Sequence, residues 1–426
     1  MSHPRAMPPG VRVFLPREAA RKRDLEGKLL SVFSRWGFQE IVTPTFEYYE
    51  ASSPSGPTLS EEAFKIIDRE TGQILTLRTD ITPQIARIAS TLLASHPLPL
   101  RLCYCTSVFR HSRTGGLIQR EFHQGGVELI GLSSLEADAE VVAIAAESLR
   151  EVGLEDFRLA LGHTGFFRGI LEELEVRGSA RERMRAAVAK KDSSALEKIL
   201  KEVGAPSGSR VMLSELPGLF GGPEVLGRAR SLVRNRRSRR ALADLERVHR
   251  MLEIYGLSDY VTFDLSEVRG FDYYTGITFE GFLEGFGYPI CGGGRYDELL
   301  SRYGGAAPAT GFAIDIDRLL LALSRRGTPE DFSPVDFLII DFSRGKRGAL
   351  ALARRLRARG FRVARDIIRR DLGGSLEYAR KTGIRKCIVL GRKGVGPGRV
   401  LLKDMVTGKE EARELGSLVA ELERER

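Results

Sequence analysis

The chain has 426 residues, of which 42% are hydrophobic and 29% charged, and its formal net charge is +10. A single compact core of this size is uncommon, so we expect two domains. No apolar run reaches the roughly 18 residues of a membrane-spanning helix, and the N-terminus lacks the apolar segment of a secretory signal. These features exclude an integral membrane protein and favour a cytoplasmic one.

The positive charge is concentrated at the C-terminal end of the sequence. Residues 333–426 contain 23 Lys and Arg against 12 Asp and Glu, whereas the rest of the chain is nearly neutral. A basic domain fits a polyanionic partner such as RNA, and it equally fits a solvated, arginine-rich surface. Both interpretations stay open at this point.

The four cysteines do not form the pattern of a disulfide framework. Cys103 and Cys105 share one face of a predicted strand, but no second pair of Cys or His lies at metal-ligand spacing. We therefore expect reduced thiols and no bound metal. A metal site or a disulfide at this pair is the alternative.

The first quarter of the sequence predicts a helix, extended segments and a strand that leads into a second helix. Residues 12–39 carry apolar side chains at three- and four-residue spacing, and Gly37 ends the pattern. Residues 74–80 then read as the strand. Asp80 and Thr82 lie where this strand meets the following helix, and we expect one of them to cap the helix N-terminus.

Residues 101–131 predict a hairpin of two antiparallel strands joined by a glycine-containing loop. The alternation of side chains along strands places Arg110, Gln124 and Glu128 on one face. A cation, an amide and a carboxylate together can hold an amino acid, because the carboxylate binds its ammonium group while cation and amide bind its carboxylate. The alternative is that all three are ordinary surface side chains.

The region from Leu135 to about Tyr255 is predicted to be mostly helical. It contains two arginine-rich runs, at residues 181–185 and 228–240. Runs of this kind on amphipathic helices are more often a solvated face than a ligand site. Their role is left open by the sequence.

After Val261 the sequence regains strand character, with glycines and aromatic residues at alternating positions. Tyr273 and Tyr274 fit either core packing or the wall of a small-molecule pocket. The glycine triplet 292–294 is a weak phosphate-loop signal, because no complete motif follows it. Beyond a linker near residues 328–335, alternating strands and helices predict a small α/β domain.

Five segments of the sequence are informative when they are taken in order. They are LRTD, FRHSRTGGLIQREFHQGGVELIG, EVRGFDYYTG, GGGRYDELL and GFAIDIDRLLLAL. Together they resemble the catalytic core of the class II histidyl-tRNA synthetases. They are most similar to the catalytically silent paralogues of these enzymes, the regulatory subunits of ATP phosphoribosyltransferase. The resemblance spans about residues 10–325 and extends more loosely over 335–426, which is similar to the synthetase anticodon-binding domain.

The resemblance implies an α/β fold with an α+β core. A class II synthetase-like antiparallel sheet is flanked by helices and followed by a small C-terminal α/β domain of the anticodon-binding type. The core domain would comprise residues 1–327, with a helical insertion at about 165–255. The second domain would comprise residues 333–426.

By the same resemblance, the amino-acid half of the site is kept. Seven residues stand at histidine-pocket positions, and the two arginines among them lie where the carboxylate and the α-phosphate would meet. These residues are Asp80, Arg110, Gln124, Glu128, Arg269, Tyr273 and Tyr274.

The ATP half departs from the synthetase pattern. Ser112 replaces the glutamate of the FRxE motif, Ile118 replaces the loop arginine, and Asp315 replaces a glycine in the last motif, ahead of Arg318. Two like charges about 4 Å apart repel by on the order of several kcal/mol at an effective dielectric near 20. We therefore expect these four residues to mark a degenerate ATP site.

The resemblance thus implies a non-catalytic regulatory subunit of ATP phosphoribosyltransferase, required for the first step of histidine biosynthesis and for its feedback regulation by histidine. It implies no cofactor and a short-form catalytic subunit as partner, in a hetero-octamer that contains a homodimer of this chain. Histidine would be the effector, and no binding to tRNA or membranes is expected.

Two alternatives stay open. An active histidyl-tRNA synthetase, that is, a histidine-tRNA ligase, is favoured by the retained Arg269. A non-enzymatic RNA-binding module is favoured by the basic C-terminal domain, because affinity for RNA depends on Lys and Arg contacts to phosphate.

Overall fold

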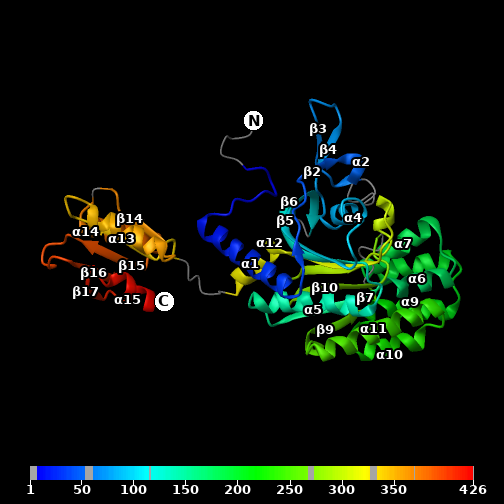
Figure 1. Ribbon diagram of the computed structural model, residues 1–426. Coiled ribbons are helices and arrows are strands. Elements are labelled where there is room, and N and C mark those ends of the chain that lie inside the picture. Colours follow the sequence, from blue (N-terminus) through cyan, green and yellow to red (C-terminus); the bar gives the residue numbers. More distant parts are fainter. Residues whose placement is uncertain are drawn as a thin grey trace. The chain divides into compact units, whose positions relative to one another are not determined.

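The computed structural model describes residues 7–52, 61–114, 117–266, 273–326, 333–368 and 370–425, without the side chains of residues 112–114, 117, 118, 207–209 and 211. Figure 1 shows the course of the chain. It divides into two compact units, formed mainly by residues 21–326 and by residues 327–426. Each unit is described by itself, and the domain boundaries at residues 327 and 333 stay a prediction. Among the described helices, none has both the length and the apolar character needed to cross a membrane.

A nine-stranded mixed sheet forms the centre of the first unit (Figure 1). Its middle strands pair antiparallel, whereas parallel pairs join the first two strands and the strands β7 and β9. This arrangement confirms the predicted fold class. Across the sheet, the strands are β1 (Gln39–Glu40), β5 (Leu100–Thr114), β6 (Leu117–Ile130), β12 (Ala309–Asp315), β11 (Pro289–Arg295), β10 (Ile277–Leu283), β7 (Phe157–His163), β9 (Val261–Asp264) and β8 (Phe220–Gly221).

The predicted hairpin is the pair β5 and β6, the two longest strands of the sheet. Its register places Gln124 opposite Thr106 and Glu128 opposite Leu102. Gln124 and Glu128 are four residues apart on one strand and therefore point to the same face. The expectation that they share a face is confirmed.

Helices cover the sheet, namely α1 (Pro16–Arg35), α4 (Thr82–Ser90), α5 (Leu135–Glu151) and α12 (Ile316–Arg325). Leu29 of α1 and Ile316 of α12 approach Gly125 on one face of β6. On the other face, Ile85 of α4 packs in one buried cluster with Tyr104 of β5. The apolar spacing that predicted α1 matches its buried side chains.

The expected helical stretch between Leu135 and Tyr255 is mostly helical, and it also contains strands β7 and β8, a 3-10 turn at Leu216–Gly218 and short connecting segments. β7 belongs to the central sheet, in which it pairs with β10. Its side chains are buried on both faces, which suits an inner strand and not a surface helix. The helices after β7 form one side of the unit in Figure 1. They are α6 (Thr164–Glu173), α7 (Gly178–Ala189), α8 (Ser193–Glu202), α9 (Ser207–Glu215), α10 (Glu224–Leu232) and α11 (Arg236–Ile254).

A three-stranded antiparallel sheet and the short helix α2 (Tyr49–Ser52) precede α4. Phe46, Tyr48 and Ile66 of this small sheet are 54%, 49% and 41% exposed. Exposed apolar side chains gathered on one sheet face usually mark a contact surface. The strands, in sheet order, are β2 (Phe46–Tyr48), β4 (Ile74–Leu77) and β3 (Lys65–Ile67).

The expected capping of α4 by Asp80 or Thr82 is wrong. The N-cap residue is Ile81, and no side chain caps the helix. Asp80 Oδ1 instead accepts a hydrogen bond from the backbone N of Ile81 at 2.7 Å, and Thr82 Oγ1 donates to Glu128. The Thr82 hydroxyl, which the local sequence suggested as a cap of α4, therefore makes a tertiary contact with Glu128 of β6 instead.

The second unit has a five-stranded sheet with two parallel and two antiparallel pairings. Its apolar strands pack against helices in two buried clusters. The predicted small α/β domain is thereby confirmed as a fold. In sheet order its strands are β14 (Val363–Arg365), β13 (Phe337–Asp341), β15 (Lys386–Leu390), β16 (Arg399–Asp404) and β17 (Glu410–Glu414), and its helices are α13 (Arg347–Ala358), α14 (Leu372–Thr382) and α15 (Leu418–Arg424).

Candidate functional site

The candidate site lies on the face of β6 that carries Gln124 and Glu128. Strand β12 runs beside β6, with Gly311 opposite Glu128 and Asp315 opposite Gln124. Directly opposed residues of an antiparallel pair point to the same side of the sheet. Asp315 therefore joins this face next to Gln124, while a glycine leaves room beside Glu128.

Glu128 is the buried centre of the site, with 1% of its surface exposed. Its carboxylate accepts hydrogen bonds from Thr82 Oγ1 at 2.6 Å and from the Tyr296 hydroxyl. Burial raises the pKa of Glu128 to about 8, and the negative charge of Asp80 adds to that rise, although the two donated hydrogen bonds oppose it. A pKa of about 8 favours the neutral acid at pH 7, and a cation bound beside Glu128 would favour its charged form.

Glycines make the space that these polar groups occupy. A Cβ atom at Gly311 would lie 1.9 Å from Glu128 Oε2, and one at Gly126 would lie 2.7 Å from the Tyr104 hydroxyl oxygen. Contacts this short exclude any side chain at either position. The glycines of β6 and β12 therefore leave room for side chains of the site itself.

Three tyrosines form the wall next to Glu128. The rings of Tyr273 and Tyr274 lie 4.4 Å apart, and the Tyr273 hydroxyl donates to that of Tyr274 at 3.3 Å. The Tyr296 ring lies 6.3 Å from that of Tyr273. Burial raises the pKa of all three hydroxyls above the usual value for tyrosine, so they act as neutral hydrogen-bonding groups.

Two polar atoms at this face are buried without a hydrogen-bond partner among the described residues, namely Gln124 Oε1 and the Tyr104 hydroxyl oxygen. A buried polar atom left unpaired costs about 1–3 kcal/mol. Both atoms lie on the strands that carry the candidate amino-acid pocket. Polar groups of a bound ligand would satisfy them.

Arg110 marks the other end of the site. Its guanidinium carbon lies 4.6 Å from the centre of the Phe122 ring, and its charge lowers the pKa of Asp315, which burial raises to about 6 overall. Asp315 is thus opposed to Gln124 across the two strands, and Arg110 is near enough to Asp315 for its charge to affect the pKa of that carboxyl. Of the remaining predicted residues, Arg269 and the side chains of Ser112 and Ile118 lie outside the described part of the chain.

Asp315 and Arg318 bind each other at the start of α12. Asp315 Oδ1 accepts from the backbone N of Arg318 at 3.0 Å, and Oδ2 lies 3.1 Å from Arg318 Nε. Arg318 Nη1 donates to the carbonyl oxygen of Pro289 at 2.7 Å, and the guanidinium lies over the Tyr288 ring. The cation predicted to belong to a degenerate ATP site is thus already neutralised by the neighbouring carboxylate.

Sequence reasoning missed three members of the site, Thr82, Tyr104 and Tyr296. Tyr104 could have been found, because it alternates with Thr106 on β5 and faces Gly126 across the hairpin. Thr82 and Tyr296 reach Glu128 from 46 and 168 residues away in the sequence. Only the tertiary structure brings them to this carboxylate.

The four cysteines are free thiols, as expected. Burial raises the pKa of Cys103 and Cys105 to about 12, so neither forms a reactive thiolate at neutral pH. Within the described residues, no group of three or more His, Cys, Asp or Glu is arranged to hold a metal ion.

Comparison with known proteins defines the class first. A family model described as histidyl-tRNA synthetase matches residues 10–319, and one described as an anticodon binding domain matches residues 338–425. The crystal structure of histidyl-tRNA synthetase from Nostoc sp. is similar at a TM-score of 0.85, with 23% sequence identity and 100% coverage of both chains. The fold is that of the histidyl-tRNA synthetases.

Closer relatives narrow the class. A protein of Geobacter sulfurreducens named ATP phosphoribosyltransferase regulatory subunit is 45% identical over 95% of this chain and 92% of its own length. One of the same name from Syntrophotalea carbinolica is 43% identical over 98% and 97%. A crystal structure from Bacillus halodurans, described as an ATP phosphoribosyltransferase regulatory subunit/histidyl-tRNA synthetase, has a TM-score of 0.80 and 33% identity, covering 92% of this chain and 99% of its own. The chain belongs to the family of ATP phosphoribosyltransferase regulatory subunits.

Proposed function

We propose that this chain is a non-catalytic subunit that makes ATP phosphoribosyl transfer responsive to histidine, acting on a separate catalytic subunit. The observation that carries the proposal is the contrast between the two halves of one site. Glu128, Thr82 and Tyr296 form a complete hydrogen-bonded centre for an amino acid, whereas Arg318 is bound by Asp315. A site of this kind suits binding without activation of the ligand by ATP.

Histidine fits the chemistry of the proposed pocket. A neutral Glu128 with a pKa of about 8 gains its charge when the ligand brings an ammonium or an imidazole N–H against it. Asp80 supplies a second carboxylate nearby, as its effect on the pKa of Glu128 indicates. At the far end, Arg110 and the amide of Gln124 suit the ligand carboxylate. Tyr273, Tyr274 and, by resemblance, Arg269 complete the proposed set.

Histidine would regulate by binding one state of the complex more tightly than the other. A ligand shifts an equilibrium only by its difference in affinity for the two states. The pocket is suited to such a difference, because the Tyr273–Tyr274 wall belongs to the segment that enters β10 beside the sheet core. A shift of this segment would alter both the pocket and its surroundings.

The proposed partner is a short-form catalytic subunit, in a hetero-octamer that contains a homodimer of this chain. The exposed apolar face of the small sheet, with Phe46, Tyr48 and Ile66, supports an assembly of this kind because it is unfavourable in water. The basic C-terminal unit gives weaker support to RNA binding. Many of its cations are ion-paired within the unit, among them Arg359, Arg362 and Arg413, so we propose no tRNA partner.

The competing function, an active histidine-tRNA ligase, is favoured by the shared fold and by Arg110 at the site. The test is ATP–pyrophosphate exchange by the purified chain with and without histidine. We expect no exchange above background, because Arg318 is not available to a triphosphate. Histidine-dependent exchange would establish the ligase in place of the regulatory subunit.

A further inference from the structure

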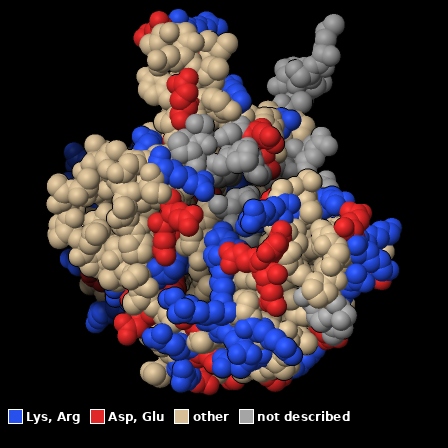
Figure 2. Space-filling model, turned by 90° about the vertical axis from the view of Figure 1, so that its right-hand side faces the viewer, with Lys and Arg blue, Asp and Glu red and all other residues tan. Residues whose placement is uncertain are grey.

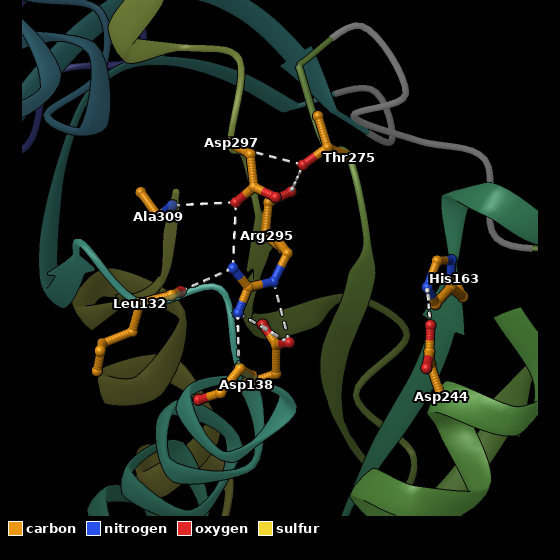
Figure 3. Close-up of polar contacts among 9 residues, drawn as sticks. Leu132, Asp138, His163, Asp244, Thr275, Arg295, Asp297 and Ala309 are labelled. Carbon is orange, nitrogen blue, oxygen red and sulfur yellow. Dashed lines mark hydrogen bonds and ion pairs between the residues drawn. The ribbon is translucent and has the colours of Figure 1, made fainter. Parts of the chain in front are cut away.

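A second cavity, of about 590 Å³, lies between β11, the start of α5, the start of α6 and one side of α11. Arg295 and Asp138 form its inner wall and His163 and Asp244 its opposite side, as Figure 3 shows. Neither Glu128 nor Gln124 lines it. It is therefore separate from the proposed histidine pocket.

On the inner wall, the hydrogen-bond donors of Arg295 are taken up by protein groups. Arg295 is 6% exposed and donates to Asp138 Oδ2 at 3.0 Å, to Asp297 Oδ1 at 3.1 Å and to the carbonyl oxygens of Leu132 and Ser134 at 2.9 and 3.0 Å (Figure 3). All sides of its guanidinium are used. This cation and its two carboxylates hold the wall in place and leave no donor for a ligand.

The outer wall carries cations of two kinds: Arg237 is ion-paired with Glu172, whereas Arg240 and Arg247 have no close ion-pair partner among the described residues. Arg237, Arg240, Asp244 and Arg247 recur at three- and four-residue spacing and so form one stripe along α11 that lines the cavity. Arg240 reaches Asp244 only at 3.9 Å, and among the described residues Arg247 has no ion-pair partner. Figure 2 shows the side of the molecule that lies at the right in Figure 1, and basic side chains gather on its lower part with acidic ones among them.

His163 adds a donor that faces the same space. Its Nδ1 accepts from the backbone N of Gly165 at 2.9 Å, so the ring proton must be on Nε2. Nε2 lies 3.8 Å from Asp244 Oδ2, too far for a hydrogen bond (Figure 3). Burial and the charges of Arg237, Arg168 and Arg240 lower the pKa of His163 to about 3. The ring is therefore neutral, so that His163 offers Nε2–H as a hydrogen-bond donor without a charge of its own.

Backbone N–H groups complete the set. The 17-residue helix α5 begins at Leu135 with Ser134 as its N-cap residue, and no side chain caps it. Ser133 and Ser134 line the cavity at this helix start, whereas the backbone N of Gly165, at the start of α6, already donates to His163 Nδ1. Helix N-termini favour anions, because their first N–H groups have no partner within the helix.

We propose that this cavity binds a phosphate-bearing small molecule, with the phosphate between the Arg240–Arg247 stripe, the Nε2–H of His163 and the start of α5. The volume exceeds what a phosphate alone requires, so the remainder would take the body of the ligand against Met251 and Ile277. The arginine-rich stretch at residues 228–240 thereby acquires a specific role at its C-terminal end.

The test is calorimetric titration of the full-length chain with inorganic pyrophosphate and, separately, inorganic phosphate, at constant ionic strength. We expect saturable binding of pyrophosphate at one site per chain, and weaker binding of phosphate. The double variant R240Q/R247Q should bind pyrophosphate at least about tenfold more weakly, since each arginine supplies a charge-assisted hydrogen bond. The thermal unfolding midpoint without ligand should not change, because both side chains are exposed.

The matched control is R236Q/R250Q, which removes the same charge from exposed positions of α11 that do not line the cavity. It should keep the wild-type affinity for pyrophosphate within about twofold, because neither arginine lines the cavity, whereas attraction that depends only on net charge would fall equally in both double variants. Absence of saturable binding to the wild type would overturn the proposal. An equal loss in both double variants would overturn it as well, because it would show attraction to the basic surface and no site.

Discussion

Asp315 and Arg318 form an ion pair within the first turn of α12, with 3.1 Å between Oδ2 and Nε, while the other carboxylate oxygen caps the helix. One carboxylate thus begins the helix and neutralises the guanidinium that follows it. The neighbouring carboxylate offsets the charge of this arginine and so weakens its attraction to a phosphate. The pair gives a physical reason for the degenerate ATP site inferred from the sequence.

Replacing Asp315 with Asn should free Arg318 without loss of the helix cap, because Asn and Asp are equally good N-cap residues. We expect ATP to bind to D315N about tenfold more tightly than to the wild type in equilibrium dialysis. The control is D317N, since Asp317 accepts from His123 and not from Arg318. Equal ATP binding by D315N and the wild type would contradict the role given to the pair.

Histidine binding should release protons. Glu128 has a pKa of about 8 and is therefore mostly protonated at pH 7, whereas a bound cationic or N–H donor group favours its carboxylate. Calorimetry in buffers of different ionisation enthalpy should detect a proton lost per bound histidine, at pH 7 but not at pH 9. E128Q should abolish binding, and E121Q, on the same strand, should preserve it. Histidine binding by E128Q with unchanged affinity would refute the assignment.

The stability of the ligand-free protein should also report on Glu128. Its pKa is raised on folding from 4.5 to about 8, so its contribution to stability is complete below pH 4.5 and lost as pH rises through 8. E128Q should match the wild type near pH 5 and exceed it at pH 9, by on the order of 4 kcal/mol. Urea unfolding followed by the fluorescence of Trp36, the single tryptophan, measures this in the first unit. Parallel pH profiles for the two proteins would count against the raised pKa.

Removal of Asp138 should destabilise the first unit strongly. Asp138 and Arg295 form a buried ion pair at 3.0 Å, and D138A leaves the cation without its most buried partner. Breaking a buried pair on one side costs about 3–5 kcal/mol. D297A removes a partner whose side chain is 38% exposed and should cost clearly less. The same tryptophan-monitored unfolding distinguishes them, and equal losses would show that burial does not set the cost.

The exposed apolar face of the small sheet should hold the proposed homodimer together. F46D places a charge among Phe46, Tyr48 and Ile66, and light scattering should then show the mass of a monomer at concentrations where the wild type is dimeric. L350D, at a 51% exposed leucine of α13 in the second unit, is the control and should stay dimeric. A dimeric F46D would place the interface elsewhere.

The fold and the centre of the site were predictable where the signal is local. The hairpin of residues 101–131 has strand alternation and a glycine loop, and these alone place Gln124 and Glu128 on one face. The helix α1 follows from its apolar spacing. Such patterns depend on neighbours in the chain, which a sequence displays directly.

Other features depend on contacts that no local pattern contains. Thr82 looked like a helix cap and serves Glu128 instead, and Tyr296 reaches the same carboxylate across 168 residues. Strand β7 lies inside a stretch whose sequence predicts helices. Its burial on both faces is explained only by its place in the sheet, beside β10. The sequence shows that Asp315 stands where the synthetases have a glycine. Its ion pair with Arg318 follows only from the conformation at the start of α12.

The most direct test of the regulatory role is the rate of ATP phosphoribosyl transfer by a short-form catalytic subunit, measured with and without this chain and with and without histidine. We predict that transfer requires the chain, that histidine inhibits the complex, and that E128Q keeps the stimulation while losing the inhibition. A transfer rate that is the same with and without this chain would contradict the account.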